Sequence, residues 1–315
     1  MSDNSKINIK SSKLEFIPPH PLNTAVLFLV FNRLDTTKQV FEAIRQAKPP
    51  RLYIAADGAR ETKEGEAEKV KAVRHYITSN VDWECEVTTL FREQNFGCKM
   101  AVSGAIDWFF ENEEMGIILE DDILPSQSFF WFCEELLEKY KDDMRIGQIS
   151  GFNYGYKNKD LNYDYLFSKY PMIWGWASWA NRWKNYSLEL KDLNEINNNN
   201  QFALLFGKQE LANRMNIFEK IQKHKIDTWD YQWSFTLYKN SQYTVIPKNN
   251  YILNLGFGDD ATHTSGKNPY TNLELEEMKS ELKHPNYIIQ DISLYKVINS
   301  KKNIFQKIFT KVMKK

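Results

Sequence analysis

The sequence is poor in the residues that build disulfide-bonded or thiolate-metal proteins. Its 315 residues contain three cysteines, Cys85, Cys98 and Cys133, and no two of them stand at the close spacing of a zinc or redox motif. Isolated cysteines of this kind are usually packing residues. We therefore expect three reduced and partly buried thiols.

Long apolar runs and a surplus of either charge are also missing. No segment approaches the roughly 20 apolar residues that cross a bilayer, and residues 1–13 are polar and lack the apolar centre of a signal peptide. The 41 basic and 41 acidic side chains cancel, so no net charge attracts nucleic acid. These absences predict a cytoplasmic protein that acts through specific sites and does not bind nucleic acid.

What is present suits a folded domain with a large core. Hydrophobic residues make up 42% of the chain and charged residues 26%, as in soluble globular proteins. We expect a polar leader at 1–22, one main domain at 23–270 and an extension at 271–315. No internal repeat of solenoid or propeller period interrupts the main domain.

Apolar runs alternate with amphipathic or mixed segments through the first 150 residues. Asp35 and Ser126 are placed to cap two of the helices. The predicted strands are 24–31, 51–56, 85–91, 116–120 and 146–150, and the predicted helices follow residue 35 and cover 61–77, 99–110 and 128–140. This alternation predicts an α/β fold with a parallel sheet and crossover helices.

The second half of the chain is less regular. Aromatic residues are dense at 154–186, and the asparagine-rich stretch 197–200 is predicted to be a loop. A helix is expected at 202–224, and further aromatic segments continue to residue 257.

Three consecutive acids stand where a short predicted strand ends. The run GIILE finishes at Glu120, and Asp121 and Asp122 follow directly. Ligands of open parallel sheets bind outside the carboxyl ends of the strands, so these acids are placed to meet one. Mg²⁺ and Mn²⁺ prefer oxygen ligands and often use one or two carboxylates together with substrate phosphates. Asp122 is the first candidate for the metal ligand, and a solvated acidic turn is the alternative.

Eight segments in a fixed order carry a resemblance that no one of them carries alone. They are VLFLVFNR, AADG, NFGCKMAVSGAIDWFF, ILEDDILPSQSFFWF, ISGFN, WGWASWANRW, TWDYQW and NLGFGDDATHTSG. Between about residues 24 and 266 the chain resembles glycosyltransferases of the GT-A type, in particular the inverting N-acetylglucosaminyltransferase I type, in which Glu-Asp-Asp replaces the usual DxD motif. The resemblance implies a Rossmann-like, mostly parallel mixed sheet flanked by helices, with the nucleotide bound by about 23–125 and the acceptor by about 126–270.

The resemblance also implies a donor site. The acids Glu120, Asp121 and Asp122 would hold the diphosphate of a nucleotide-sugar, most simply a UDP-sugar, with Mn²⁺ or Mg²⁺. Further donor-site residues implied in the same way are Arg33 and Asp57, the latter accepting from a base edge, and Asn95 and Gly97 in the turn before residue 99.

Aromatic residues and a histidine complete the implied site. Trp174 or Trp176 would form the floor of the sugar pocket, because sugar rings stack on indoles, although dense tryptophans are often core. His263, in the Gly-rich stretch GFGDDATHTSG, would contact phosphate or metal. An inverting transfer needs a carboxylate base, for which Asp230 is the first candidate and Asp227 its rival.

These expectations amount to a hexosyltransferase that passes a sugar to a hydroxyl of a glycan or lipid-linked acceptor in surface polysaccharide or glycoconjugate synthesis. Two alternatives stay open: a sugar nucleotidyltransferase, which would share the fold, and a non-catalytic carbohydrate-binding module, which would need only the aromatics. The nucleotidyltransferase is disfavoured because residues 30–37, VFNRLDTT, lack the Gly-rich basic loop of such enzymes.

The end of the chain differs from the rest. Residues 300–315 contain lysines and no acid, and their apolar residues from Ile304 to Met313 repeat at helical spacing. Such a helix would either contact an anionic membrane surface or pack on the protein itself.

Overall fold

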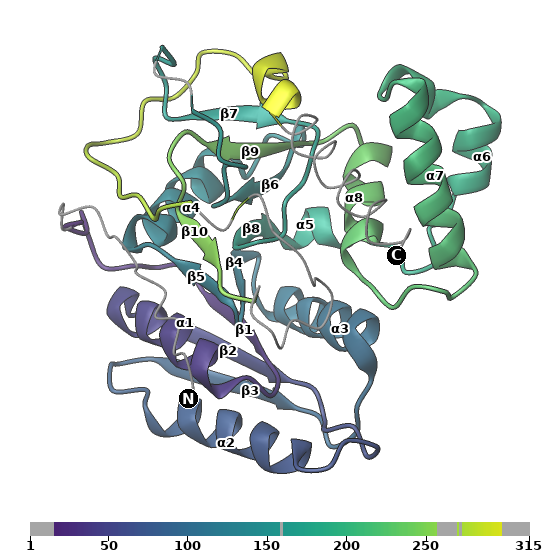
Figure 1. Ribbon diagram of the computed structural model, residues 1–315. Helices are drawn as coiled ribbons and strands as arrows, with labels where there is room; N and C mark the ends of the chain where they lie inside the picture. The colour runs from purple at the N-terminus through teal and green to yellow at the C-terminus, as the bar shows by residue number, and fades with distance from the viewer. Residues whose placement is uncertain (1–15, 158–159, 257–269, 271–272, 298–315) are drawn as a thin grey trace, which may run out of the picture.

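The computed structural model describes residues 16–157, 160–256, 270 and 273–297, and its centre is an eight-stranded sheet (Figure 1). The strands lie in the order β3-β2-β1-β4-β8-β6-β9-β7. They are β1 Val26–Val30, β2 Arg51–Ala56, β3 Glu86–Phe91, β4 Met115–Glu120, β6 Ile146–Ser150, β7 Tyr165–Ser168, β8 Trp176–Trp179 and β9 Tyr243–Pro247. A second, two-stranded sheet pairs β5 Ile123–Pro125 with β10 Ile252–Asn254.

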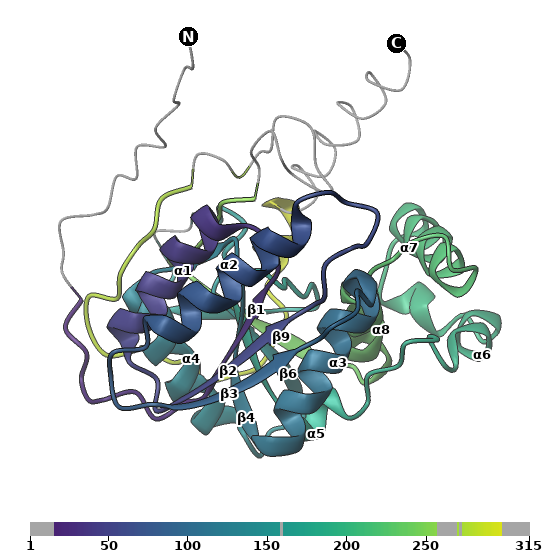
Figure 2. The same cartoon turned by 90° about the horizontal axis from the view of Figure 1, so that it is seen from below.

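Helices cover both faces of the large sheet. They are α1 Leu34–Ala47, α2 Glu66–Ser79, α3 Gly97–Asn112, α4 Gln127–Tyr140, α5 Ala180–Trp183, α6 Leu193–Asn198, α7 Lys208–Gln222 and α8 Asp230–Lys239, with a 3₁₀ turn η1 at Gln201–Leu204. Figure 2 shows α1 and α2 on one side of strands β1–β3 and α3 on the other. The predicted fold class, a Rossmann-like and mostly parallel sheet flanked by helices, is confirmed.

Strand β1 shows why the chain folds into layers. All five of its residues are buried, as in a strand covered on both faces. Val26, Phe28 and Val30 belong to the core under α1 and α4, whereas Leu27 and Leu29 belong to the core under α3 and α8. Two apolar cores therefore hold β1 in one register between its parallel neighbours β2 and β4.

This register brings three strand ends to one edge of the sheet. Val30 of β1 pairs with Ala56 of β2, and Leu29 pairs with Glu120 of β4, so these strands stop at the same level. The loops that follow, together with the first turn of α3, surround the space beyond this edge. The fold thus places the predicted acids at the carboxyl ends of parallel strands.

The sheet departs from the prediction beyond β4. Strand β8, from the tryptophan-rich segment, is antiparallel and lies between β4 and β6, and β7 is antiparallel at the edge. The run 176–179 was not predicted as a strand because its aromatic side chains do not alternate with polar ones. Both of its faces are buried, and its four residues all lie in the interior.

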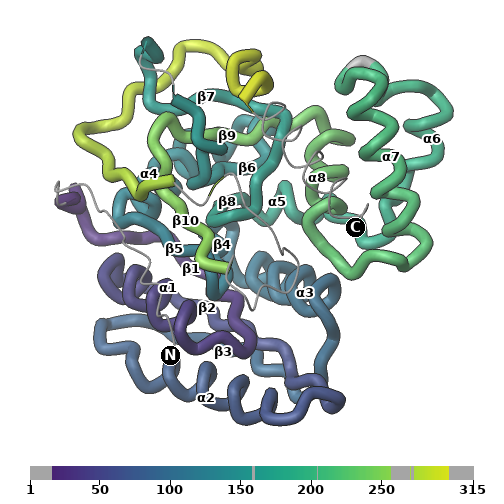
Figure 3. Tube along the Cα trace, viewed as in Figure 1, coloured from purple at the N-terminus to yellow at the C-terminus, as the bar shows by residue number. Residues whose placement is uncertain are grey.

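Several local predictions were wrong. Residues 197–198 end the short helix α6, and the helix expected at 202–224 is divided into η1 and α7 around Gly207. These helices stand apart from the sheet (Figure 3). Asp35 lies within the first turn of α1 rather than capping it.

The expected Ser126 cap is replaced by a distant carboxylate. Glu277 accepts from the backbone N–H groups of Gln127 and Ser128 at 3.2 and 2.8 Å, and no side-chain cap bond comes from Ser126. Residues 273–297 therefore run back over the main domain, and Leu282 and Leu294 join its core. No helix among the described residues is long and apolar enough to cross a membrane.

Candidate active site

A cavity of about 1060 Å³ opens beyond the carboxyl ends of β1, β2 and β4. It gathers segments from the whole main domain: the ends of those strands, the start of α3, the segment before α8 and the end of β10. Apart from Trp176, all the predicted site residues that the structure describes line it, namely Arg33, Asp57, Asn95, Gly97, Glu120, Asp121, Asp122, Trp174, Asp227 and Asp230. His263 lies outside the described residues.

The acidic cluster of Glu120, Asp121 and Asp122 is paired with the side chain of Arg33. The guanidinium of Arg33 donates to Asp122 Oδ2 from Nη1 at 2.8 Å and to Asp121 from Nη2 and Nε. Arg33 was expected to contact the donor, and here its guanidinium holds two neighbouring carboxylates. Arg33 precedes α1, so the contact joins the end of β1 to the end of β4.

Burial and mutual repulsion make it unfavourable for all three acids of this cluster to be ionised at once. Burial, followed by the charges of Asp122 and Asp121, raises the pKa of Glu120. Burial also raises the pKa of Asp121 to about 6, although the charge of Arg33 acts in the opposite direction. One guanidinium therefore faces three acids, and a further cation would stabilise their ionised forms.

The oxygen atoms of these acids suit a hard divalent cation that is also bound by the oxygens of a substrate. No group of three metal-binding side chains is assembled among the described residues, so protein side chains alone do not form a metal cage there. Asp122 offers a carboxylate, and the residue after β10 fixes its backbone, because Leu255 N–H donates to the Asp122 carbonyl at 2.7 Å. One carboxylate completed by phosphate oxygens is a usual arrangement for Mg²⁺.

Two aspartates cap the start of α3. Asp57 accepts from the N–H groups of Phe96 and Gly97 at 3.0 and 3.1 Å, and Asp227 accepts from those of Cys98 and Lys99, both at 3.0 Å. They come from the loops after β2 and before α8. Asp57 was expected to recognise a base edge. In this structure its carboxylate binds backbone N–H groups at the start of α3, and the base contact stays a prediction.

Gly97 and Asn95 are tied to the same arrangement. Gly97 has a φ of +77°, and a Cβ on it would stand 2.8 Å from Asp227 Oδ2, so the cap needs a glycine there. The side-chain amide of Asn95 donates to the carbonyl of Gly58 at 2.7 Å. Both residues line the cavity, and both have a structural reason to be there.

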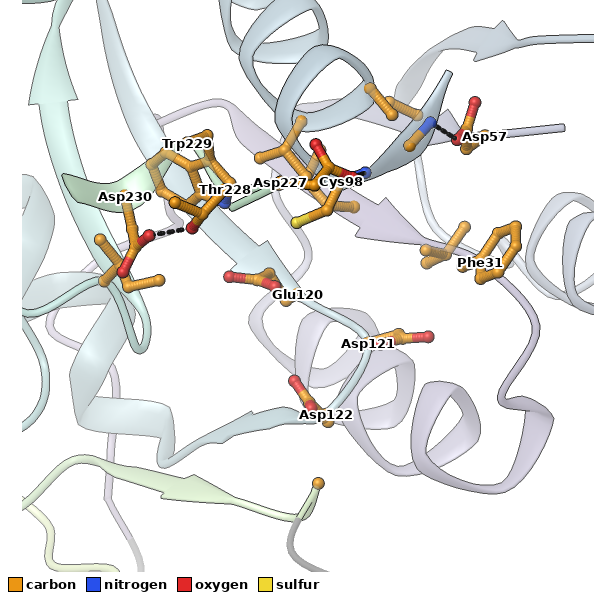
Figure 4. A pocket seen from close by; sticks show the side chains of 18 of the residues that line it. Phe31, Asp57, Cys98, Glu120, Asp121, Asp122, Asp227, Thr228, Trp229 and Asp230 are labelled. Carbon is orange, nitrogen blue, oxygen red and sulfur yellow. Dashed lines mark hydrogen bonds between the residues drawn. The ribbon is translucent and has the colours of Figure 1, made fainter. Parts of the chain in front are cut away.

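Asp230 differs from Asp227 in what surrounds it. It is the first residue of α8, and the Thr228 hydroxyl donates to its Oδ1. Figure 4 shows Glu120 between Asp230 and the other two acids of the cluster. The charge of Asp230 is among those that raise the pKa of Glu120, so the two carboxylates face the same space.

The tryptophans divide into core and cavity. Trp176 is fully buried against Trp183, Trp229 and Trp233, so the suggestion that it floors a sugar pocket was wrong. Trp174 is half-buried and lines the cavity, and its ring packs edge-to-face on Phe152 with centroids 4.8 Å apart. A Trp174 floor remains compatible with this geometry.

Sequence reasoning did not identify several lining residues, among them Thr228, Cys98, Arg60, Arg92 and Lys225. Thr228 had a signal, a hydroxyl two residues before a candidate base. The three cations had none, because their placement depends on loops that meet only in the fold. Cys98 lines the cavity and is exposed, Cys85 is half-buried and Cys133 is buried, so the expectation that all three thiols are partly buried was wrong for Cys98.

Comparisons with known proteins found similarity in structure only. No protein-family model matches the sequence, and no curated protein matches it. The structure is similar to HddC from Yersinia pseudotuberculosis, with a TM-score of 0.32 and 12% identity over 54% of this chain and 85% of that one.

Two other solved structures show a similar extent of likeness. For S. aureus TarS 1–349 the TM-score is 0.41 at 9% identity, over 73% of this chain and 60% of that one. For UDP-glucose pyrophosphorylase complexed with UDP-glucose the TM-score is 0.30 at 10% identity, over 52% of this chain and 79% of that one. Likeness at this level does not assign a function to the cavity.

Proposed function

We propose that the protein is a glycosyltransferase that moves a sugar from a nucleotide-diphosphate sugar, a UDP-sugar, to an acceptor hydroxyl with inversion. The proposal rests on one observation: the acids that end β4 and Asp230 of α8 line the same cavity. A row of acids at the end of β4 faces a separate carboxylate, Asp230, at the start of α8. Acids at a strand end suit a metal-bound diphosphate, and a second carboxylate across the space suits a base.

The nucleotide half would occupy the side of the cavity formed by β1 and β2. Leu29, Val30 and Ala55 give it an apolar wall, and Arg92 also lines the cavity. An apolar wall with few polar groups is what a flat base requires. Carboxylate oxygens of Asp57 keep spare acceptor capacity beyond the α3 amides, which permits a bond to a base N–H.

The diphosphate would lie over the acidic cluster. Asp122 would hold Mn²⁺ or Mg²⁺ together with the phosphates, and Glu120 and Asp121 would supply the surrounding negative charge. When bound, such a cation takes up negative charge on the leaving diphosphate. Arg33 lies close enough to its acids to reach the same phosphates after a rotation of its side chain.

The sugar would lie between the two groups of acids, with Ile173 and Trp174 as its apolar neighbours. Asp230 would then remove the proton of the acceptor hydroxyl as that oxygen attacks the anomeric carbon from the face opposite the diphosphate. The Thr228 hydroxyl donates to Oδ1 of Asp230 and so orients this carboxylate at the wall of the cavity. Asp227 is the weaker candidate because both of its oxygens accept from the α3 backbone.

The acceptor would be a glycan or a lipid-linked sugar, as used in the synthesis of surface polysaccharides and glycoconjugates. The lysines of 300–315 would then keep the enzyme near anionic lipid, at roughly 1 kcal/mol per lysine close to the surface. This peripheral contact, like the cytoplasmic location that goes with it, is part of the proposal.

The test is a panel of nucleotide-sugars, incubated with the protein with and without Mn²⁺ and analysed for released nucleoside diphosphate. Metal-dependent release of UDP from a UDP-sugar is the expected result. Consumption of pyrophosphate with release of UTP would instead indicate a nucleotidyltransferase. Sugar binding that needs neither nucleotide nor metal, measured by calorimetry, would indicate a carbohydrate-binding module.

A further inference from the structure

The position of Arg33 has a consequence for the order in which ligands bind. Its guanidinium reaches the two acids that flank the site of the expected cation, Asp121 and Asp122. The side chain of Asp121 is 4% exposed and that of Asp122 is 14% exposed, so water does little to screen the contact. Arg33 itself is only partly covered, with 31% of its side chain exposed, and it lines the cavity.

A guanidinium and a metal ion that share one carboxylate oxygen compete for its negative charge. Nη1 of Arg33 donates to Asp122 Oδ2 at 2.8 Å, and this is also the Asp122 oxygen that lies beside Gly256. A divalent cation on this oxygen would also repel the positive charge beside it. A metal ion arriving alone must therefore displace Arg33 from a buried ion pair and leave it without an anion.

A diphosphate changes this balance because it gives the guanidinium another anion. The fork of an arginine fits phosphate as well as carboxylate. Arg33 can then leave Asp122 without losing its partner, and Asp122 becomes free for the cation. The cation and the diphosphate each make the binding of the other easier, and such coupling is equal in both directions.

We propose, on the basis of the function proposed above, that Arg33 is a built-in counter-ion that prevents tight binding of a divalent cation until a nucleoside diphosphate is present. The enzyme would thus bind its cation together with the donor rather than before it. Arg33 would hold the acids together in the free enzyme and contact the diphosphate in the loaded one. In the absence of the donor, the cavity would therefore hold no tightly bound divalent cation.

The experiment measures binding and needs no turnover. Free Mn²⁺ is followed by electron paramagnetic resonance during titration of the protein, with and without UDP. In the wild-type protein we expect Mn²⁺ to bind at least about tenfold more tightly when UDP is present. In Arg33→Met, which removes the charge but keeps an apolar chain, we expect Mn²⁺ alone to bind at least about tenfold more tightly than to the wild type, and UDP to add less than about threefold.

Two further variants locate the effect. Arg60→Met removes another arginine at the cavity that pairs with a different acid, Glu66, and it should leave Mn²⁺ binding as in the wild type. Arg33→Met combined with Asp122→Ala should lose the Mn²⁺ affinity that the single change gains. If Arg60→Met gains the same affinity as Arg33→Met, the effect is a general change in charge and the inference is wrong.

Folding gives an independent measurement. Removal of Arg33 leaves the buried acids without their cation, so Arg33→Met should melt at a lower temperature than the wild type, and Mn²⁺ alone should raise that melting temperature more than it raises the wild-type value. If Arg33→Met does not fold without metal, recovery of its circular dichroism on addition of Mn²⁺ supports the inference. No recovery, with Arg33→Gln, a second variant without the charge, also binding Mn²⁺ no better than the wild type, overturns it.

The remaining outcomes separate this inference from the function on which it rests. Wild-type protein that binds Mn²⁺ as tightly alone as with UDP would show that Arg33 does not control the order, and the glycosyltransferase proposal would stand. A folded Arg33→Met that binds Mn²⁺ no more tightly than the wild type would have the same meaning. Wild-type protein that binds no UDP, with or without Mn²⁺, would overturn both.

Discussion

Two aspartates compete for the role of base, and single substitutions to asparagine should separate them. Asp227 caps α3, because it accepts from the N–H groups of Cys98 and Lys99 at 3.0 Å, whereas Asp230 accepts from the Thr228 hydroxyl inside the cavity. A carboxylate cap at a helix start contributes about 0.5–2 kcal/mol. Asparagine has one acceptor oxygen where Asp227 uses two, so Asp227→Asn should lose one of the two backbone bonds and cost about 1 kcal/mol.

Asp230→Asn should behave in the opposite way. The asparagine can still accept from Thr228, so the free energy of unfolding should change by less than about 0.5 kcal/mol. It cannot take a proton, however, so kcat should fall by at least about 100-fold while the affinity for UDP stays within about threefold of the wild type.

The assays are urea unfolding followed by circular dichroism, UDP titration calorimetry and initial rates of UDP release. Asp227→Asn should be less stable but active, and Asp230→Asn should be stable but inactive. The reverse pattern, in which Asp227→Asn keeps the wild-type stability and loses turnover while Asp230→Asn remains active, would refute Asp230 as the base.

Three further predictions concern stability and location. Arg60 lowers the pKa of Glu66 to about 2 from 4.5, so this ion pair stabilises the fold above about pH 4.5 and the contribution is lost as the pH falls towards 2; Glu66→Gln should lower the urea midpoint at pH 7 and progressively less between pH 4.5 and 2. Gly97→Ala should destabilise by about 1–3 kcal/mol in urea unfolding, more than Gly65→Ala, since both have positive φ but only Gly97 also meets a neighbouring side chain. If 300–315 contacts lipid, the whole protein should sediment with anionic vesicles at low salt and its truncation at residue 299 should not; an intact protein that stays in solution would contradict this.

The sequence predicted the first half of the fold well because its strands are continuous apolar runs. Strand β2 was predicted with the observed bounds, and the acids after β4 were placed at the carboxyl edge by the strand that leads to them. In both cases the signal lies within a few consecutive residues. Local burial patterns were sufficient there.

The site's internal contacts could not be predicted in the same way. The pairing of Arg33 with Asp121 and Asp122 joins residues 88 and 89 positions apart, and the cap on Lys99 comes from Asp227, 128 positions away. Such contacts depend on which loops the sheet brings together. Trp176 shows the same limit, because only its place between β4 and β6 decides that it packs in the core rather than on a sugar.

The acids after β4 are proposed to hold the donor through a divalent cation, and Asp122→Ala tests this role most directly. Calorimetric titration with UDP in the presence of Mn²⁺ should show saturable binding to the wild type, and to Asp82→Ala, which removes an exposed acid before β3. Asp122→Ala should fold normally and bind UDP at least about 100-fold more weakly, since it lacks the proposed metal ligand. Equal Mn²⁺-dependent affinity in Asp122→Ala and the wild type would contradict the account.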